Sequence, residues 1–421
     1  MKKIINKTKL KKILKKTVLA VSFLYTPFAY AAGYQLTEHS TAGLGRSFAG
    51  AGVVGDDYSA VAYNPAGMQL VKTNGAQAGF TTVGIRSKVR GTVDVVNPVE
   101  GEGSTDGYAV SVLPAVFSQY RLSDKAVLGI GLYTPFGLGT DYDNNWFGRT
   151  HALLSEVEVF NIGPALSYQI TDWLTVGAAL NVQYLTAKLT SIREEPMSFG
   201  YVDTGLKTEI SGEDVGLSYL LGIMVEPFSG TRLGISYRPE VKHKLDGNLL
   251  INGAHFYNAK AKVSTPQSIT FSLNQTVTDK LSVSATARWT KWEVFDKLDV
   301  THAETGGMLS HTDEKWKNTW FYSIGADYAL NKNWTLRIGG AYDQSTIRSS
   351  LYRTARIPDG RRLWTSFGLS WKVGNWTLDG GYAHLFVKNV TARGGSTPHS
   401  DIAIKYSSNA NLFSFSAQYN F

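Results

Sequence analysis

The chain has 421 residues, of which 42 are Lys or Arg and 34 are Asp or Glu, and it contains no cysteine. The lack of cysteine excludes a disulfide-stapled domain, thiolate metal sites and cysteine nucleophiles. Eight lysines lie within the first 16 residues, so the remaining 34 basic residues equal the 34 acidic ones. The rest of the chain is therefore close to neutral, and its charge does not indicate binding to nucleic acid.

Residues 1–31 have the pattern of a secretory signal peptide. The lysine-rich start is followed by a short apolar run from Val18 to Phe28, and then by Ala29-Tyr30-Ala31, which supplies the small residues of a cleavage site. A membrane anchor is the alternative, but a spanning helix needs about 20 apolar residues. We therefore expect export from the cytoplasm and a mature chain that begins at Ala32.

Residues 32–73 show no regular alternation, and they are rich in glycine between residues 43 and 52. That run superficially resembles a phosphate-binding loop, but such a loop requires a preceding strand and a following helix in a βαβ unit. A disordered leader is a second alternative. The segment holds Leu36, Leu44, Phe48 and Met68, which is too much apolar surface to leave in water. We expect a compact, folded segment.

From residue 74 onward the hydrophobic pattern has a period of two. Between Leu174 and Tyr184 the even positions are apolar and the odd positions are small or polar, and 281–289 and 334–343 repeat the pattern. Such segments are strands with one polar and one apolar face. After residue 31 no stretch approaches about 18 consecutive apolar residues, so a membrane would be crossed by a closed barrel of strands.

Three features favour such a barrel over a soluble β-sandwich, which also alternates. Aromatic residues such as Trp173, Trp334 and Trp376 recur at strand ends, as at a membrane boundary. Short turns alternate with long polar stretches, and the last segment alternates up to Phe421. The expected fold is all-β, with fourteen antiparallel transmembrane strands within residues 74–421. The short turns fall at 122–124, 171–172, 229–230, 278–279, 331–333 and 374–375.

A barrel of this size has a lumen wider than its own side chains can fill. Residues 32–73 are the obvious segment to close it, because their glycines allow the backbone to approach the wall closely. We therefore predict that this segment is an N-terminal hatch, or plug, inside the lumen.

Four segments of the sequence form a further pattern. They are Ala32-Gly33-Tyr34-Gln35-Leu36; Gly43-Leu44-Gly45-Arg46 with Asn64-Pro65-Ala66; Pro135-Phe136-Gly137-Leu138 through Trp146, Gly148-Arg149, Ala152-Leu153 and Ser155; and Ile357-Pro358-Asp359 with Arg362 and Trp364. In this order, and with fourteen strands, they resemble the FadL-type outer-membrane transporters, which include long-chain fatty acid and aromatic-hydrocarbon (TodX-like) members. The resemblance runs from Ala32 to Phe421.

The resemblance implies a plugged fourteen-stranded barrel in the bacterial outer membrane, with a lumenal ligand pocket and a kinked third strand. It implies passive transport of long-chain fatty acids or similar hydrophobic compounds, released sideways at the kink. Carried over to this chain, the gate would lie between Asn64, Pro65 and Ala66 of the hatch and Phe136 and Gly137 of the third strand. A plain strand end is the alternative, because Pro135 and Gly137 both interrupt a ladder.

A fatty acid needs a long apolar slot and a cation for its carboxylate. The resemblance points to Arg362 and Lys188, and more weakly to Arg193, as cations. The alternative for each is an ordinary lumenal ion pair, for example with Asp343. Expected apolar contacts come from the hatch and from the loop after the third strand. These are Tyr34, Leu36, Leu44 and Leu153.

No catalytic or cofactor motif accompanies these residues. The eight histidines are scattered, with neither a nucleophile elbow nor metal-ligand spacing near them, so we expect no enzyme activity and no cofactor. Expected partners are the hydrophobic ligand, outer-membrane lipid and lipopolysaccharide, and the barrel-assembly machinery through Phe421, with no nucleic acid. The alternative function is a structural or adhesive surface barrel whose long loops bind a host.

Overall fold

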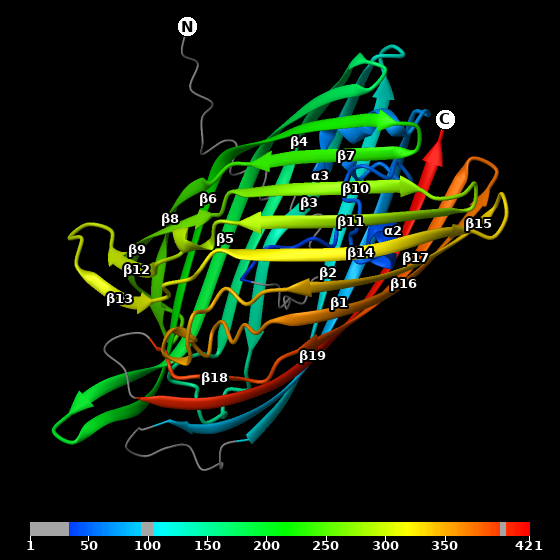
Figure 1. Ribbon diagram of the computed structural model, residues 1–421. Helices are drawn as coiled ribbons and strands as arrows, with labels where there is room; N and C mark the ends of the chain where they lie inside the picture. The colour runs from blue at the N-terminus through cyan, green and yellow to red at the C-terminus, as the bar shows by residue number, and fades with distance from the viewer. Residues whose placement is uncertain (1–32, 94–103, 396–400) are drawn as a thin grey trace, which may run out of the picture.

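The computed structural model describes residues 33–93, 104–395 and 401–421 (Figure 1). The predicted signal peptide, residues 1–31, lies outside the described residues. No helix in the described part of the chain is long and apolar enough to span a membrane.

In the described residues, nineteen strands form a single sheet, accompanied by short helices. The helices are α2 (Thr41–Gly45), α3 (Ala60–Tyr63), η2 (Pro65–Leu70), η3 (Trp292–Val294) and η4 (Ser350–Tyr352). The strands are β1 (Gly75–Val93), β2 (Ser104–Arg121), β3 (Ala126–Asp141), β4 (Leu154–Thr171), β5 (Leu174–Met197), β6 (Gly200–Phe228), β7 (Thr231–Arg238), β8 (Val241–Ile251), β9 (Ala254–Thr265), β10 (Ser268–Thr276), β11 (Leu281–Thr290), β12 (Lys297–His302), β13 (Met308–Asp313), β14 (Thr319–Ala329), β15 (Trp334–Asp343), β16 (Arg362–Val373), β17 (Trp376–Val387), β18 (Val390–Ala392) and β19 (Ile402–Asn420).

The sheet closes into a barrel because β1 pairs with β19 along its whole length, from Gly75 opposite Asn420 to Val93 opposite Ile402. Several wall strands are interrupted and count once. β6 pairs with β7 near one end and with β8 near the other, and β9 and β10 continue each other in the same way across Pro266, which has no N–H for the ladder. Counted so, the wall is a closed antiparallel barrel of fourteen strands, as predicted.

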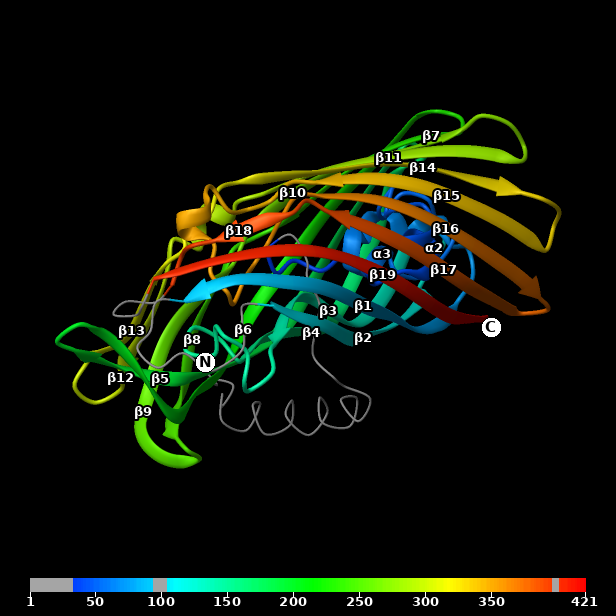
Figure 2. The same ribbon diagram turned by 90° about the horizontal axis from the view of Figure 1, so that it is seen from below.

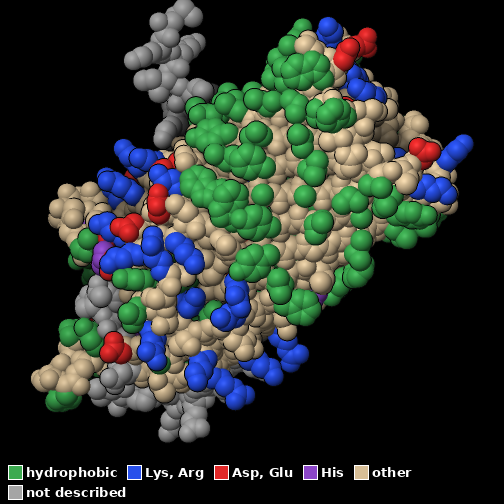
Figure 3. Space-filling view, viewed as in Figure 1, with side chains coloured by type: hydrophobic (Ala, Val, Ile, Leu, Met, Phe, Trp, Pro, Cys, Tyr) green, Lys and Arg blue, Asp and Glu red, His purple; other side chains and the backbone are tan. Residues whose placement is uncertain are grey.

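The two faces of the wall are chemically opposite. On β5 the outward Leu180 is 56% exposed, whereas the inward Asn181 is 1% exposed. Trp334 stacks on Trp371 near the short turns, with 5.6 Å between ring centroids. Figure 3 shows hydrophobic side chains gathered as a belt over the middle of the wall and its short-turn end. An apolar outside and a polar inside are the reverse of a soluble core and are typical of a barrel in lipid.

The hatch, residues 33–73, lies inside the ring of strands (Figures 1 and 2). Its apolar side chains are buried against the wall; Leu44 and Phe48 lie in one cluster and Val61 and Met68 in another. Glycines make this contact possible, since a Cβ on Gly45 would lie 2.7 Å from the Cα of Gly368 on β16. The backbone of α2 therefore touches the backbone of the wall.

Four charged groups, of which Asp56 is partly exposed and the other three are buried, fix the hatch to the wall. Arg46 of the hatch pairs with Asp56 of the hatch at 2.6 Å and with Asp327 of β14 at 3.1 Å. Arg337 of β15 pairs with the same two carboxylates, at 3.0 and 2.8 Å. Each group has at least two partners of opposite charge, and Arg337 also lies 3.7 Å from Asp379. Removing one group would therefore leave its partners with an uncompensated charge.

The fit between hatch and wall can be tested at two neighbouring glycines of β15. A Cβ on Gly339 would collide with the backbone of Arg46, whereas the nearest atom to a Cβ on Gly340 is the Trp364 carbonyl oxygen, 3.5 Å away. We expect Gly339→Ala to destabilise the folded protein by about 1–3 kcal/mol, as overpacking does, and to raise ion leakage across a planar bilayer. Gly340→Ala is the control, and equal effects of the two changes would contradict this account.

Candidate functional site

A cavity lies in the barrel towards its long-loop end. The atom-free space within it, including its mouth, is about 1250 Å³. Hydrophobic side chains from distant parts of the chain supply most of its lining, among them Leu138, Val157, Leu245, Leu298 and Ile357. Such a slot can take a long apolar molecule.

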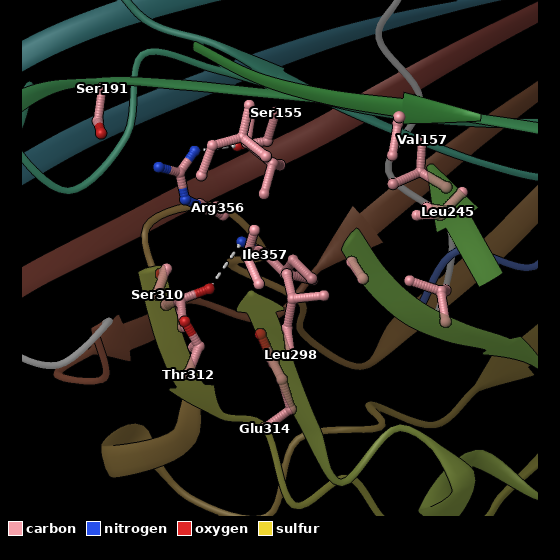
Figure 4. Close-up of a pocket in the computed structure, with 18 of the residues that line it drawn as sticks. Ser155, Val157, Ser191, Leu245, Leu298, Ser310, Thr312, Glu314, Arg356 and Ile357 are labelled. Carbon is pink, nitrogen blue, oxygen red and sulfur yellow. Dashed lines mark hydrogen bonds between the residues drawn. The ribbon is translucent and has the colours of Figure 1, made fainter. Parts of the chain in front are cut away.

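Two cations of the described residues line this cavity. One is Lys260 of β9, whose side chain is exposed, and the other is Arg356, which enters from the segment between β15 and β16 (Figure 4). Its Nη1 donates to the hydroxyl of Ser155 at 3.1 Å and to the carbonyl oxygens of Leu154 and Thr190 at 3.3 and 3.2 Å. Among the described residues no carboxylate lies within ion-pair distance of it. Burial lowers the pKa of Arg356 to about 10. The guanidinium therefore stays charged at neutral pH, without a counter-ion from the described chain.

A carboxyl group, Glu314, lies at another end of the same cavity, and Figure 4 shows Ile357 and Leu298 between the two. Glu314 is 3% exposed and accepts a hydrogen bond of 2.9 Å from the indole of Trp316. Burial raises the pKa of Glu314 to about 8, although Trp316 and Arg356 act in the opposite direction. This carboxyl is therefore mostly neutral at pH 7 and leaves the charge of Arg356 available.

The start of the hatch borders the cavity. Tyr34 lines it and packs edge-on against Trp292 and Phe295, with ring centroids 4.7 and 5.8 Å apart. Its hydroxyl donates to the carbonyl oxygen of Ser264. Gly33 precedes it with a positive φ of 62°, directly against the rings of Trp292 and Trp316. The first residues of the hatch are thus held by aromatic rings and by strand edges.

The same segment fills an irregularity in β3. The register between β3 and β4 shifts between Tyr133 and Phe136, so the ladder skips Thr134 and Pro135. There the hatch pairs with β3 instead: the Leu36 N–H donates to the Pro135 carbonyl at 2.9 Å, and the Gly137 N–H donates to the Tyr34 carbonyl at 2.8 Å. A short piece of hatch therefore acts as a strand at the kink.

Comparison with known proteins places these features in a family. The family described as "Outer membrane protein transport protein (OMPP1/FadL/TodX)" matches residues 22–421. The chain belongs to this family. FadL-type proteins are outer-membrane transport channels rather than enzymes, and the chain is accordingly an outer-membrane protein of bacteria.

Individual relatives of the FadL-type family match along most of the chain. Outer membrane protein P1 of Haemophilus influenzae is 28% identical over 407 residues, covering 86% of this chain and 87% of the relative. The long-chain fatty acid transport protein of Escherichia coli O6:H1 is 24% identical, covering 86% and 88%. The crystal structure of a Pseudomonas aeruginosa FadL homologue has a TM-score of 0.84 at 23% identity, covering 93% of this chain and 100% of that one. It shares the barrel fold.

The cations predicted from the FadL-type resemblance all have acidic partners. Arg362 is 2% exposed, is ion-paired with Asp359 and lies 3.8 Å from Asp343, so the ion-pair alternative describes its surroundings. Half-exposed surface pairs hold the other two, with Lys188 at 3.0 Å from Glu209 and Arg193 at 3.4 Å from Glu195.

The predicted apolar contacts are dispersed over the molecule. Tyr34 lines the main cavity, whereas Leu36 lines a second, smaller cavity, and Leu44 lies in a hydrophobic cluster between hatch and wall. Leu153 packs with Trp146 in the cluster of the outer loops. Of the seven ligand residues predicted, Tyr34 is the one that lines the main cavity.

The residues of the predicted gate have different neighbours. Asn64 caps η2 by accepting from the Ala66 N–H at 3.1 Å, and it donates to the Ile223 carbonyl of β6 at 3.1 Å. Pro65 and Ala66 lie against Gly177 of β5. Phe136 and Gly137 instead meet the first hatch residues, as described above. The described contacts thus place the start of the hatch, rather than the Asn-Pro-Ala turn, at the kink of β3.

Sequence reasoning missed Arg356 and Glu314, two charged groups of the cavity. Arg356 directly precedes the Ile357-Pro358-Asp359 segment on which the resemblance partly rests, so its position was a usable signal. The sequence offered no usable signal for Glu314, because this residue lies in a long polar stretch with other acids and its burial depends on distant strands.

The shifted pKa of Glu314 predicts how stability depends on pH. The folded-state pKa of about 8 exceeds the ordinary 4.5, so its contribution is full below pH 4.5 and is lost as the pH rises to about 8. We expect Glu314→Gln to flatten the decline of the unfolding free energy over this range, measured with denaturant in detergent. Glu293→Gln, at an exposed side chain paired with Lys291, is the control. Parallel pH profiles for wild type and Glu314→Gln would refute the shift.

Proposed function

We propose that this protein transports long-chain fatty acids, or similar hydrophobic acids, passively across the outer membrane. The observation that carries the proposal is Arg356, a partly buried cation without an acidic partner among the described residues, at the edge of an apolar cavity. A fatty acid would place its carboxylate on the guanidinium and its chain along Leu298 and Leu245.

The relatives are consistent with a hydrophobic cargo but differ in kind. One is named a long-chain fatty acid transport protein, and a Pseudomonas putida structure of TM-score 0.65 at 18% identity is described as the toluene transporter TodX. An aromatic hydrocarbon has no charge for Arg356 to bind, and burying a cation without a partner is costly. The cation therefore favours an acid over a neutral hydrocarbon.

For release, the proposal uses the segment that borders the cavity. Residues 33–36 separate the main cavity from a second one that Leu36 and Pro135 line. Withdrawal of this segment from β3 would break the two hydrogen bonds of Leu36 and Gly137 and join the cavities beside the kink. The ligand would then leave sideways next to Phe136 and Gly137. The turn of Asn64, Pro65 and Ala66 would hold the hatch below this opening.

In this proposal the ion pairs of the hatch restrict the movement to residues 33–36, the first residues of the hatch. Arg46 and Asp56 remain bound to β14 and β15, so the lumen stays closed while the ligand passes. Arg362 is assigned to fixing the loop through Asp359 rather than to binding cargo. Recognition of Phe421 by the barrel-assembly machinery stays a prediction.

Removal of the cation tests the proposed ligand site. We expect Arg356→Gln to weaken oleate binding roughly 10- to 100-fold, because a hydrogen bond to a charged group contributes about 1.5–3 kcal/mol. Titration calorimetry in detergent would measure it, and oleyl alcohol should bind both proteins alike. Arg348→Gln is the matched control, since Arg348 also donates to backbone carbonyls, of Lys315 and Trp316, in the same loop. Unchanged oleate affinity in Arg356→Gln would sink the assignment.

Locking the hatch tests the proposed exit. The chain has no cysteine, so Gln35→Cys with Phe136→Cys places one disulfide across the bridge between hatch and β3. We expect the oxidised double variant to bind oleate but to lose its uptake, and reduction to restore uptake. Thr41→Cys with Ser414→Cys locks the hatch body, where the two hydroxyls lie 2.7 Å apart, and should transport normally. Equal uptake before and after reduction of the first variant would rule out this exit.

A further inference from the structure

A second large hollow opens at the long-loop end beside β15, β16 and β17, and its lining is strongly basic. It contains about 1290 Å³ of atom-free space, including open solvent. Lys317, Arg361, Lys388 and Arg393 line it with exposed side chains, and the buried Arg353 lies behind them. No Asp or Glu is among the described residues of this lining.

Strand register shows which way these cations face. Leu363 of β16 pairs with Phe386 of β17, and both are more than half exposed on the lipid side of the wall. Two residues from Leu363 and Phe386, just beyond the ends of β16 and β17, stand Arg361 and Lys388. A hydrogen bond of 3.0 Å from the Lys388 N–H to the Arg361 carbonyl continues the strand pairing there. Alternation by two keeps them on the same face. They therefore lie directly above the hydrophobic belt, on its outside.

Arg361 and Lys388 lie opposite each other, and no carboxylate of the described residues neutralises them or the other two exposed cations of the hollow. No ion pair within the described residues involves Lys317, Arg361, Lys388 or Arg393, in contrast to Arg46 of the hatch and Arg337 of β15. Like charges that face each other across two strands destabilise the pair. Such a cluster of cations favours the binding of an anion that belongs to another molecule.

The basic surface continues around the barrel. Thr391 of β18 pairs with Lys405 of β19, and Lys405 in turn stands opposite Arg90 of β1. The side chains of Lys405 and Arg90 are exposed. Arg86 and Lys88, four and two residues before Arg90 on β1, are exposed on the same face of that strand. Figure 3 shows Lys and Arg side chains gathered between the hydrophobic belt and the long-loop end. Cations thus border the apolar surface over several neighbouring strands.

We propose that this hollow binds the phosphate groups of a phosphorylated glycolipid of the outer leaflet, the lipid A part of lipopolysaccharide. Lys317, Arg361, Lys388 and Arg393 would take the phosphates, and the acyl chains would lie on Leu363 and its apolar neighbours below. Cations directly above an apolar belt match a molecule that carries phosphate above hydrocarbon. A free phosphate would use the cations alone.

The test compares three charge removals at the hollow with three at the opposite end of the barrel. The full chain, folded in detergent, carries either Arg361→Gln, Lys388→Gln and Arg393→Gln or the control set. The controls are Lys280→Gln, Lys332→Gln and Lys372→Gln, exposed residues in or next to the short turns. Native mass spectrometry measures the retention of bisphosphorylated lipid A, of dephosphorylated lipid A and of inorganic phosphate.

We expect wild type and control to retain bisphosphorylated lipid A, with roughly fivefold weaker binding for each cation removed from the hollow. Dephosphorylated lipid A should bind weakly to all three proteins. Equal retention by the two triple variants would overturn the proposal, as would equal binding of dephosphorylated lipid A to wild type. Displacement of lipid A by inorganic phosphate at equal concentration would also overturn it, since the site would then recognise phosphate alone. The difference in electrophoretic mobility between heated and unheated samples checks that each variant is folded.

Discussion

The structure depends on one constraint: the lumen of a fourteen-stranded barrel must be closed, and the wall cannot close it with its own side chains. The hatch closes it through backbone contact at glycines and through four paired charges, Arg46, Asp56, Asp327 and Arg337, of which Asp56 alone is partly exposed. Buried ion pairs contribute little net stability, but they are costly to break singly. They therefore hold the hatch body in one position instead of simply adding stability.

A closed barrel must still let its cargo through, and the hatch divides this task between two parts. Its body is fixed by charge and packing, whereas its first residues are bound to β3 by the two hydrogen bonds of Leu36 and Gly137 and by the rings around Tyr34. This beginning separates the apolar cavity from the kink. In our proposal, ligand binding at Arg356 and release at β3 are linked because one short segment touches both.

Much of the fold could be predicted from the sequence, because strand alternation and turn positions are local properties. The alternation of Leu180 and Asn181 gave the two faces, and turns such as 229–230 gave fourteen strands even where Pro266 interrupts a strand. The site was less accessible, since its residues meet only after the barrel closes. Arg362 matched a family position but is ion-paired, whereas Arg356, six residues earlier, reaches the cavity. Pairing of the hatch with β3 joins residues about a hundred positions apart, and no local pattern encodes it.

Hydrogen–deuterium exchange with and without oleate tests the central claim most directly, that the beginning of the hatch moves while its body stays. The account predicts that oleate speeds exchange of the Leu36 and Gly137 amides, which bond across the kink, and leaves the Gly50 amide, bonded to Ala285 of β11, unchanged. Faster exchange throughout residues 33–73 would show that the whole hatch is released. Protection of Leu36 and Gly137 on oleate binding would contradict release at this site.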